Sequence, residues 1–377
     1  MKKAVIVIPT YNEKGNIAQL IDEIIDVSKT VHNWTVEILI VDSSSPDGTA
    51  QEIKNLQLRH KNVHLLETPK EGLGRAYVQG FTYAITHLKP FVLFEMDADL
   101  SHSPRYIPSF LSKIERGADF VIGSRYIKGG SIPQNWGLHR KIFSVCANLF
   151  VRFGFMKIST TDWTGGFRAI KTWVISSAMS HIKHYTGYVF QVALLDFAHQ
   201  KGARMAEVPI AFVDRTEGIS KINSFQYIVQ TFIYVLTNSS FIKYVITGFF
   251  GFGVDFGISY LLITSGIPKG MATVISAECA IITNFLINNF WSFRSKQITG
   301  GVLGYFSKFF FFNLISSGSI IIQYFGMTSL LRFFGDRVLH LGFISISSWI
   351  VYKVLIIGFI IIPYSYILYN RVVWRKK

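Results

Sequence analysis

Short apolar runs alternate with polar stretches through about the first 220 residues of the chain. Three such runs occupy residues 4–8, 37–41 and 90–96, and each passes directly into polar and turn-forming residues. Apolar runs of about four to eight residues bounded by turn signals are typical of buried strands. Polar residues at strand ends are where open α/β sheets bind nucleotides. The pattern therefore predicts an α/β domain with chemistry-bearing side chains at one edge of its sheet.

The pattern changes after residue 240, where long apolar stretches take over. Each of four stretches has about twenty or more mainly apolar residues, the length that a helix needs to cross a hydrocarbon core of about 30 Å. The stretches lie at residues 242–264, 271–293, 302–334 and 343–369. We therefore expect an all-α membrane domain with four transmembrane helices.

Composition and charge agree with this division. The chain is 50% hydrophobic and its mean hydropathy is +0.33, which is high for a soluble enzyme. Only three of the 23 acidic residues follow residue 240, so the first part is expected to face water. Basic residues gather on one side of the four stretches, which predicts that the catalytic part and both termini are cytoplasmic. The net charge of +15 suits anionic headgroups, and because residues 241–377 supply +9 of it (12 basic minus three acidic), nucleic-acid binding is disfavoured.

Two aspartates spaced one residue apart follow the third apolar run. Asp97 and Asp99 stand in LFEMDADLSHSP, where a loop after a buried strand can aim both carboxylates at one point. Carboxylate oxygens are hard ligands that suit Mg²⁺ or Mn²⁺, and Ser101 adds a weaker oxygen ligand. A solvated acidic turn has the same sequence, so the pair alone is a weak signal. Its position after a third strand makes a metal site for a nucleotide-sugar diphosphate the favoured interpretation.

Several motifs in order give the first 222 residues a family resemblance. They are AVIVIPTYNEKGNI, EILIVDSSSPDGT, EGLGRAYVQG, MDADLSHSP, GSRYIKGG, DWTGGFRA and EVPIAFVDRTEGISK. This series resembles the inverting family 2 glycosyltransferases of GT-A fold, specifically dolichol-phosphate mannose synthases and related polyprenyl-phosphate glycosyltransferases. The last 137 residues resemble the GtrA-like four-helix membrane domain. Within them, NFLINNFWSFR and SYILYNRVVWR form a weak internal echo, which either a tandem repeat of helical hairpins or interfacial anchoring explains.

The resemblance implies a nucleotide-sugar site after the first two strands and in the glycine-rich turn. The implied donor-binding positions are Pro9, Tyr11, Glu13, Asp42, Gly72, Leu73, Arg75 and Asp97. Turn chemistry is the alternative for Pro9 and Gly72, and helix capping is the alternative for Asp42. The chain departs from the family at Ser43, which follows Asp42 where relatives usually have a second aspartate. This departure bears on which nucleotide base the donor carries.

Positive charge for an acceptor phosphate comes from three separate motifs. The expected acceptor-phosphate cluster is Arg125, Arg140, Arg215 and Lys221. Arginine matches phosphate oxygens bidentately. No carboxylate that could act as general base stands in GYVFQVALL, where this chain has Val192 and Ala193. A lipid phosphate with a second pKa of about 6 is already ionised, so it needs orientation more than deprotonation. Asp162, Thr164 and Arg168 either line the sugar pocket or form a structural turn.

The sequence thus predicts a GT-A catalytic domain over 1–221, an amphipathic interfacial helix or linker over 222–240 and a membrane domain over 241–377. The predicted function is metal-dependent, inverting transfer of mannose from GDP-mannose to a membrane polyprenyl or dolichyl phosphate. The residues expected to be catalytic are Asp99, Arg125, Arg140 and Arg215. UDP-glucose is the alternative donor. A glycolipid-translocating or tethering membrane protein with an inactive transferase domain is the alternative of a different class.

Overall fold

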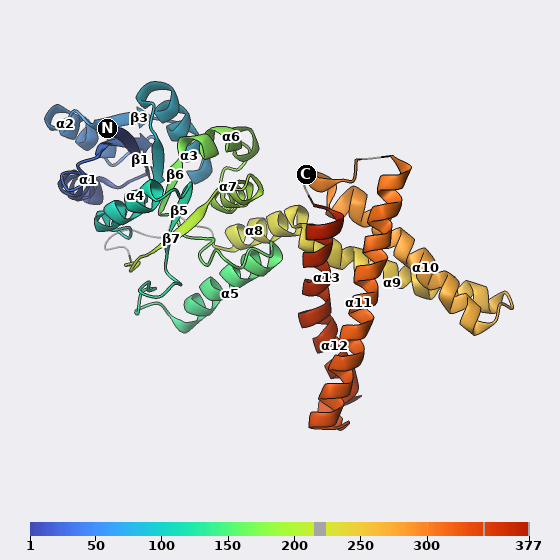
Figure 1. Ribbon diagram of the computed structural model, residues 1–377. Coiled ribbons are helices and arrows are strands. Elements are labelled where there is room, and N and C mark those ends of the chain that lie inside the picture. The colour runs from blue at the N-terminus through green and yellow to red at the C-terminus, as the bar shows by residue number, and fades with distance from the viewer. Residues whose placement is uncertain (215–223, 300, 342–343, 376–377) are drawn as a thin grey trace. The chain divides into compact units, whose positions relative to one another are not determined.

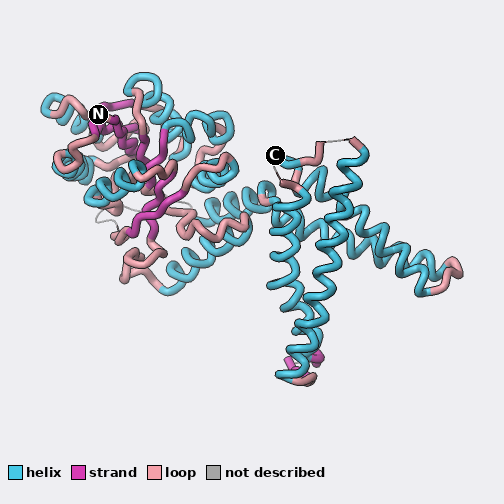
Figure 2. The backbone as a smooth tube through the Cα atoms, viewed as in Figure 1, coloured by secondary structure: helices cyan, strands magenta, loops and turns pink. Residues whose placement is uncertain are grey.

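The computed structural model describes residues 1–214, 224–299, 301–341 and 344–375. Arg215 and Lys221 of the expected acceptor cluster lie outside the described residues. The chain divides into two compact units, residues 1–235 and residues 236–377. Strands dominate the centre of the first unit and helices make up most of the second (Figures 1 and 2). The expectation of an α/β domain followed by an all-α domain is confirmed.

The first unit is built on a seven-stranded sheet in the order β3-β2-β1-β4-β6-β5-β7. Paired strands run parallel except at β6, which is antiparallel to both β4 and β5. The strands are β1 (Lys2–Thr10), β2 (Trp34–Asp42), β3 (Val63–Glu67), β4 (Val92–Glu95), β5 (Phe120–Ser124), β6 (Arg168–Lys171) and β7 (Met205–Pro209). Sheets of this mixed kind are covered by helices on both faces, which explains why β1 and β4 are apolar along almost their whole length.

Helices lie between the strands along the chain, and α8 follows β7. They are α1 (Lys14–Ser28), α2 (Thr49–Arg59), α3 (Leu73–Tyr83), α4 (Ile107–Glu115), α5 (Leu138–Gly154), α6 (Thr172–Ile182), α7 (Val189–Gln200) and α8 (Ser224–Asn238). Two short turns, η1 (Ala84–Leu88) and η2 (Pro104–Tyr106), complete the connections. On one face, Ile17, Leu20 and Ile24 of α1 share a buried core with Ile6 and Ile8 of β1. The spacing of these α1 residues is that of one helix face, so the sequence pattern directly specifies this packing.

The strands that precede the polar motifs end at one edge of the sheet. Thr10, the last residue of β1, is paired in register with Asp42, the last residue of β2. Glu95, the last residue of β4, is paired with Val7 on the other side of β1. The polar residues that follow β1, β2 and β4 therefore emerge side by side, as expected for the carboxyl ends of parallel strands.

The second unit contains four helical stretches that are long and apolar enough to span a membrane. They are α9 (Ser240–Thr264), α10 (Lys269–Ile287) with its extension η3 (Asn288–Ser292), α11 (Val302–Phe334) and the run Ser348–Val373. The run comprises α12 (Ser348–Ile356), η5 (Ile357–Ile361), α13 (Ile362–Leu368) and η6 (Tyr369–Val373). A short turn, η4 (Arg294–Lys296), follows α10. The expected four spans are thus present in the described part of the chain.

The fourth span begins later than the sequence predicts. Residues 344–347 form strand β9 (Ile344–Ser347), which pairs with β8 (Val338–Leu341), and the helix starts only at Ser348. The expected start at residue 343 was therefore wrong. The sequence Ile-Ser-Ile-Ser has the period of two that is typical of a strand.

The internal echo in the membrane part corresponds to a repeated structure. Both η3 and η6 are π-helical turns, and their first residues lie 81 positions apart (369 − 288). Phe293 N donates to Asn288 O at 2.8 Å, and Trp374 N donates to Tyr369 O at 2.9 Å. The rings of Phe293 and Trp374 stack on each other with centroids 4.5 Å apart. Equivalent turns that meet in this way favour a tandem repeat of helical hairpins over interfacial anchoring alone.

Candidate active site

Two adjoining cavities lie at the carboxyl edge of the sheet in the first unit. The first has a volume of about 430 Å³ and the second of about 660 Å³. Both are lined by Asp97, Asp99, Tyr188 and Tyr227. The loop that carries the two aspartates therefore stands where the cavities meet.

Most of the expected donor-binding residues line the first cavity. They are Pro9, Tyr11, Glu13, Gly72, Leu73 and Asp97. Pro9 is the penultimate residue of β1, and Tyr11 and Glu13 follow that strand. Gly72 directly precedes α3, Leu73 begins it, and Asp97 follows β4. The arrangement brings together residues from three segments that are far apart in sequence but share one sheet edge.

Two expected donor-binding residues do not line either cavity. Asp42 is fully buried, and its carboxylate accepts hydrogen bonds from Thr10 Oγ1 at 2.9 Å and from Ser45 Oγ at 2.6 Å. Its neighbour Ser43 lines the first cavity instead. Arg75 pairs with Glu71, with Nε 3.3 Å from the carboxylate, and its Nη1 donates to Lys183 O at 3.3 Å. The geometry gives Asp42 a role in joining β1 to β2 rather than direct access to a ligand.

The loop after β4 presents oxygen atoms to the junction of the cavities. Asp99 Oδ1 accepts hydrogen bonds from Ser101 N at 3.2 Å and Ser101 Oγ at 2.5 Å, and Ser101 lines the second cavity. Asp97 N donates to His102 Nδ1 at 3.1 Å, which fixes the other end of the loop. Within the described residues, no group of three or more His, Cys, Asp or Glu side chains forms a closed metal cage. Two carboxylates and a hydroxyl suit a cation of the Mg²⁺ kind, which commonly takes its other ligands from substrate phosphates and water.

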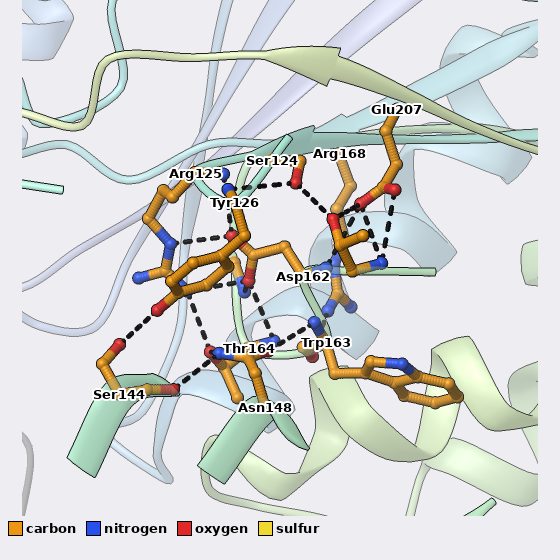
Figure 3. Close-up of polar contacts among 12 residues, drawn as sticks. Ser124, Arg125, Tyr126, Ser144, Asn148, Asp162, Trp163, Thr164, Arg168 and Glu207 are labelled. Atoms are coloured by element: carbon orange, nitrogen blue, oxygen red, sulfur yellow. Dashed lines mark hydrogen bonds and ion pairs between the residues drawn. The ribbon is translucent and has the colours of Figure 1, made fainter. Parts of the chain in front are cut away.

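The second cavity is lined by Arg125, which follows β5, and its guanidinium is held by Asp162 (Figure 3). Nε and Nη2 donate to the two carboxylate oxygens at 2.7 and 2.8 Å, and Nη2 also donates to Thr164 Oγ1 at 2.9 Å. Burial alone would raise the pKa of Asp162, but Arg125 and nearby backbone donors lower it below its ordinary value. Burial likewise opposes the charge of Arg125, and the Asp162 carboxylate outweighs it and raises the pKa of the guanidinium. Both groups therefore stay charged.

The DWTGGFRA segment mainly builds the wall behind Arg125. Thr164 lines the second cavity, whereas Asp162 is fully buried. Arg168 is also fully buried and donates to Trp163 O at 3.1 Å and Gln191 O at 2.7 Å. Of the two readings of this segment, the structural turn therefore accounts for Asp162 and Arg168.

Arg140, on α5, lines the second cavity and is more exposed to solvent than Arg125. Its guanidinium lies over the ring of Trp136, 3.9 Å from the centroid, and 3.7 Å from Asp214. The side chain of Arg140 is 48% exposed. An exposed pair at 3.7 Å is a weak restraint, so this guanidinium can turn toward a ligand.

Apolar side chains form part of the rim of the second cavity. Phe143 of α5 is 63% exposed and Ile228 of α8 is 47% exposed, and both line the cavity. The two helices contact each other through stacked rings of Phe150 and Phe232, with centroids 5.2 Å apart. A cavity with arginines inside and apolar side chains at its rim suits a ligand with an anionic head and a hydrocarbon tail.

Comparison with known proteins decides the family. The model of glycosyl transferase family 2 matches residues 5–180. The dolichol-phosphate mannosyltransferase of Pyrococcus furiosus is 31% identical over 331 residues, which cover 85% of this chain and 89% of that protein. The chain belongs to glycosyl transferase family 2. It is therefore a glycosyltransferase, and the expected resemblance is confirmed.

Further matches concern each part of this glycosyltransferase. The polyprenol monophosphomannose synthase of Mycolicibacterium smegmatis is 37% identical over 224 residues, covering 59% of this chain and 82% of that protein. The GtrA/DPMS transmembrane domain matches residues 243–374, so the chain is a membrane protein. Among solved structures, glucosyl-3-phosphoglycerate synthase from Mycobacterium tuberculosis in complex with Mn²⁺ and uridine-diphosphate-glucose matches with a TM-score of 0.45 and 16% identity, over 63% of this chain and 79% of that chain.

Several residues that line the cavities of this glycosyltransferase were missed from the sequence. They are Lys70, His102, Ser144, Tyr188, Gln191 and Tyr227. Ser144 could have been predicted from the sequence, because it lies four residues after Arg140 and therefore shares the same face of α5. Its hydroxyl lies 2.6 Å from Tyr126 OH. No comparable local pattern marks Tyr188 or Tyr227, which reach the cavities through the packing of α8 beside α7.

Proposed function

We propose that this enzyme transfers mannose, with inversion, from GDP-mannose to a membrane polyprenyl or dolichyl phosphate. The observation that carries the proposal is the pair of adjoining cavities that share Asp97 and Asp99, one lined by the donor motifs and the other by Arg125 and Arg140. The names of the two curated relatives, a dolichol-phosphate mannosyltransferase and a polyprenol monophosphomannose synthase, support this choice of sugar and acceptor.

The first cavity is the proposed donor site. Tyr11 offers an aromatic face and Glu13 offers acceptor oxygens, as a nucleoside requires. The start of α3 at Leu73 brings backbone N–H groups of a helix N-terminus to the same cavity, where they favour an anionic group. The diphosphate of the donor would then extend toward Asp97 and Asp99.

Asp97 and Asp99, with Ser101, are the proposed ligands of a divalent cation, Mg²⁺ or Mn²⁺. Such a cation, when bound, neutralises the donor diphosphate and stabilises it as a leaving group. Two carboxylates directed at a diphosphate would otherwise repel it. The hydrogen bonds from Ser101 to Asp99 hold the carboxylate in the orientation that the loop needs.

The second cavity is the proposed acceptor site. Arg125 and Arg140 supply positive charge for a phosphomonoester, and the exposed side chains of Phe143 and Ile228 suit the first part of its hydrocarbon chain. Arg215 and Lys221 remain proposed members of this cluster. Asp214 lies 3.7 Å from Arg140 and is the one carboxylate, besides Asp97 and Asp99, among the described lining residues. A phosphate that is already ionised is oriented by the arginines and needs no proton acceptor.

The proposed domain arrangement keeps both substrates at the membrane surface. Residues 1–221 carry the catalytic sites, residues 222–240 form an interfacial helix, and residues 241–377 anchor the enzyme. Helix α8 supports the second assignment, because Ile228, Phe232 and Ile233 expose about half of their surface. The distribution of basic residues supports a cytoplasmic location for the catalytic part and both termini.

One experiment tests the donor and acceptor together. The full-length protein in detergent is incubated with a polyprenyl phosphate, Mg²⁺ and either labelled GDP-mannose or labelled UDP-glucose. We expect label from GDP-mannose in the lipid phase. Transfer from UDP-glucose alone would replace mannose by glucose in the proposal. Transfer from neither donor, while a nucleotide still binds, would favour a tethering or translocating role for the membrane part.

A further inference from the structure

The charge balance of the first cavity is unusual for a site that receives a diphosphate. Its charged lining residues, within the described part of the chain, are Glu13, Asp97, Asp99 and Lys70. Three carboxylates therefore face one ammonium group. A divalent cation at Asp97 and Asp99 offsets those two carboxylates, and among the described lining residues it leaves Lys70 as the one side-chain cation for the diphosphate. The position of Lys70 thus has consequences for donor binding.

The backbone around Lys70 is fixed on both sides. Before it, Thr68 N donates to Asp42 O at 2.8 Å, and after it, Gly74 N donates to Thr186 O at 2.9 Å. Gly72 has a φ of 101°, and a Cβ at this position would lie 2.5 Å from Thr186 O. Only glycine fits there, because the left-handed conformation and the close carbonyl both exclude a side chain. The turn therefore delivers Lys70 to a defined place at the cavity edge.

The ammonium group of Lys70 rests on an aromatic ring of the same cavity. Nζ lies 3.6 Å from the centroid of the Tyr11 ring. Among the described residues, Lys70 makes no ion pair and no hydrogen bond. A cation–π contact at an exposed site is a weak interaction, and it uses none of the three N–H donors. The ammonium group is thus held close to the site while its donors stay available.

We propose that Lys70 is a mobile cation of the donor site, which covers the Tyr11 ring when the site is empty and moves onto the diphosphate when a nucleotide binds. The proposal rests on the proposed function of this cavity as a nucleotide-sugar site. An aromatic ring face covered by an ammonium group cannot at the same time stack on a base. Arrival of the base displaces Nζ from Tyr11, and the diphosphate, which enters with it, offers oxygens to the displaced group. Lys70 thereby couples recognition of the base to recognition of the diphosphate.

Two substitutions separate the charge of Lys70 from its bulk. Lys70→Met keeps the unbranched apolar side chain and removes the charge, whereas Lys70→Arg keeps the charge. Lys61→Met is the matched control, because Lys61 is exposed, lies just before β3 as Lys70 lies just after it, and lines neither cavity. It changes the net charge of the protein by the same amount.

Calorimetry of the full-length variants with GDP and Mg²⁺, repeated with UDP, tests the diphosphate contact. We expect Lys70→Met to weaken binding of the diphosphate roughly 10- to 100-fold, the effect of losing a hydrogen bond to a charged group. Lys70→Arg keeps a cation that can bond to phosphate oxygens, so it should lose less affinity than Lys70→Met, and Lys61→Met should bind as the parent does within about threefold. An affinity of Lys70→Met equal to that of the parent would overturn the proposal.

The nucleoside without its phosphates tests the ring contact. Saturation-transfer NMR with guanosine and uridine should show binding to Lys70→Met that is equal to or stronger than binding to the parent, because an ammonium group no longer competes for the Tyr11 face. If Lys70→Met lost nucleoside and diphosphate binding equally, Lys70 would instead contact the base or support the fold. That result would overturn the proposed movement of Lys70 from Tyr11 to the diphosphate. If the parent bound neither GDP nor UDP, the donor-site assignment itself would fall, and Lys70 with it.

Discussion

Arg125 and Asp162 form a two-bonded ion pair, at 2.7 and 2.8 Å, between the end of β5 and the loop before β6. The Asp162 carboxylate also accepts hydrogen bonds from Gly165 N at 2.9 Å and Arg125 N at 3.1 Å. Among the described residues, nothing accepts a hydrogen bond from Nη1 of Arg125. The pair therefore fixes the plane of the guanidinium and leaves one edge for the second cavity (Figure 3).

Replacing Arg125 by lysine should separate charge from geometry. Lysine keeps the positive charge but cannot make two parallel bonds to Asp162, so its ammonium group will not be held at the cavity wall. We expect turnover to fall at least about 10-fold, a loss of about 1.4 kcal/mol in transition-state stabilisation. Calorimetry with GDP-mannose should show unchanged donor affinity. Arg116→Lys, on the protein surface, is the control, and an equal loss in both variants would remove the special role of Arg125.

Asp99 should be essential to transfer but not to folding. Asn at this position keeps an oxygen that accepts from Ser101 and removes the charge that a divalent cation requires. Asp99→Asn should abolish transfer and metal-dependent binding of GDP-mannose while the circular dichroism spectrum stays that of the parent. Chelation should have the same effect on the parent. Undiminished transfer in excess EDTA would contradict the metal assignment.

Arg140 should act on the acceptor alone. Arg140→Ala is expected to raise the KM for polyprenyl phosphate roughly 10-fold, as for loss of one charge-assisted hydrogen bond, with donor affinity unchanged. Lys141→Ala removes the same charge from the next position of α5, outside both cavities. A matching rise in KM in Lys141→Ala would point to a general surface potential instead.

The rate of the parent should fall on acidification with a midpoint near the second pKa of the phosphate, about 6.

Asp196 should make the first unit less stable as the pH rises. Burial raises its pKa to about 6, against opposing hydrogen bonds from Gln200 and from Tyr234 OH, the latter at 3.0 Å. Because the pKa in the folded state is above the ordinary value, the folded state binds the Asp196 proton more tightly than the unfolded state does. The stability gained from this proton is complete below about pH 4 and is lost as the pH rises through about 6.

Asp196→Asn should remove this dependence. Hydrogen exchange of α7 amides at pH 8 should show the variant about 1–3 kcal/mol more stable than the parent, with no difference near pH 4. Asp22→Asn, on the exposed side of α1, is the control. Lower stability of Asp196→Asn at pH 8 would mean that the charged carboxylate is favoured in the fold.

Asn289 should hold the repeated turns of the membrane unit together. Its Oδ1 accepts from Trp374 Nε1 at 3.0 Å and from Ile298 N at 2.9 Å. Asn289→Ala leaves the buried Trp374 Nε1 without a partner, which costs about 1–3 kcal/mol, and also removes the acceptor of the partly buried Ile298 N. We expect a lower midpoint of thermal aggregation in detergent. Asn313→Ala, which loses a bond within α11 only, should change it little, and equal effects would contradict a special role for Asn289.

The sequence by itself determined the elements and the family. Apolar runs that end in polar turns specify β1, β2 and β4, because burial of a short run and reversal of the chain are local requirements. Long apolar stretches specify the membrane spans, because the thickness of the bilayer sets their length. The ordered motifs indicated the family, since their series is more specific than any single motif. The alternation in residues 344–347 was also visible in the sequence, but the apolar length around it concealed the strand.

Only the tertiary structure decided which side chains meet. Asp42 ends β2 and Asp97 follows β4, yet the Asp42 carboxylate accepts a hydrogen bond from Thr10 inside the fold. Lys70 lines the first cavity, whereas Arg75 does not. Arg125 meets Asp162 across 37 residues because β6 enters the sheet antiparallel between β4 and β5. Spacing along a chain encodes local periodicity, whereas partners this distant depend on strand order and on packing of the whole domain. The physical roles of these residues therefore follow from the fold and not from their motifs.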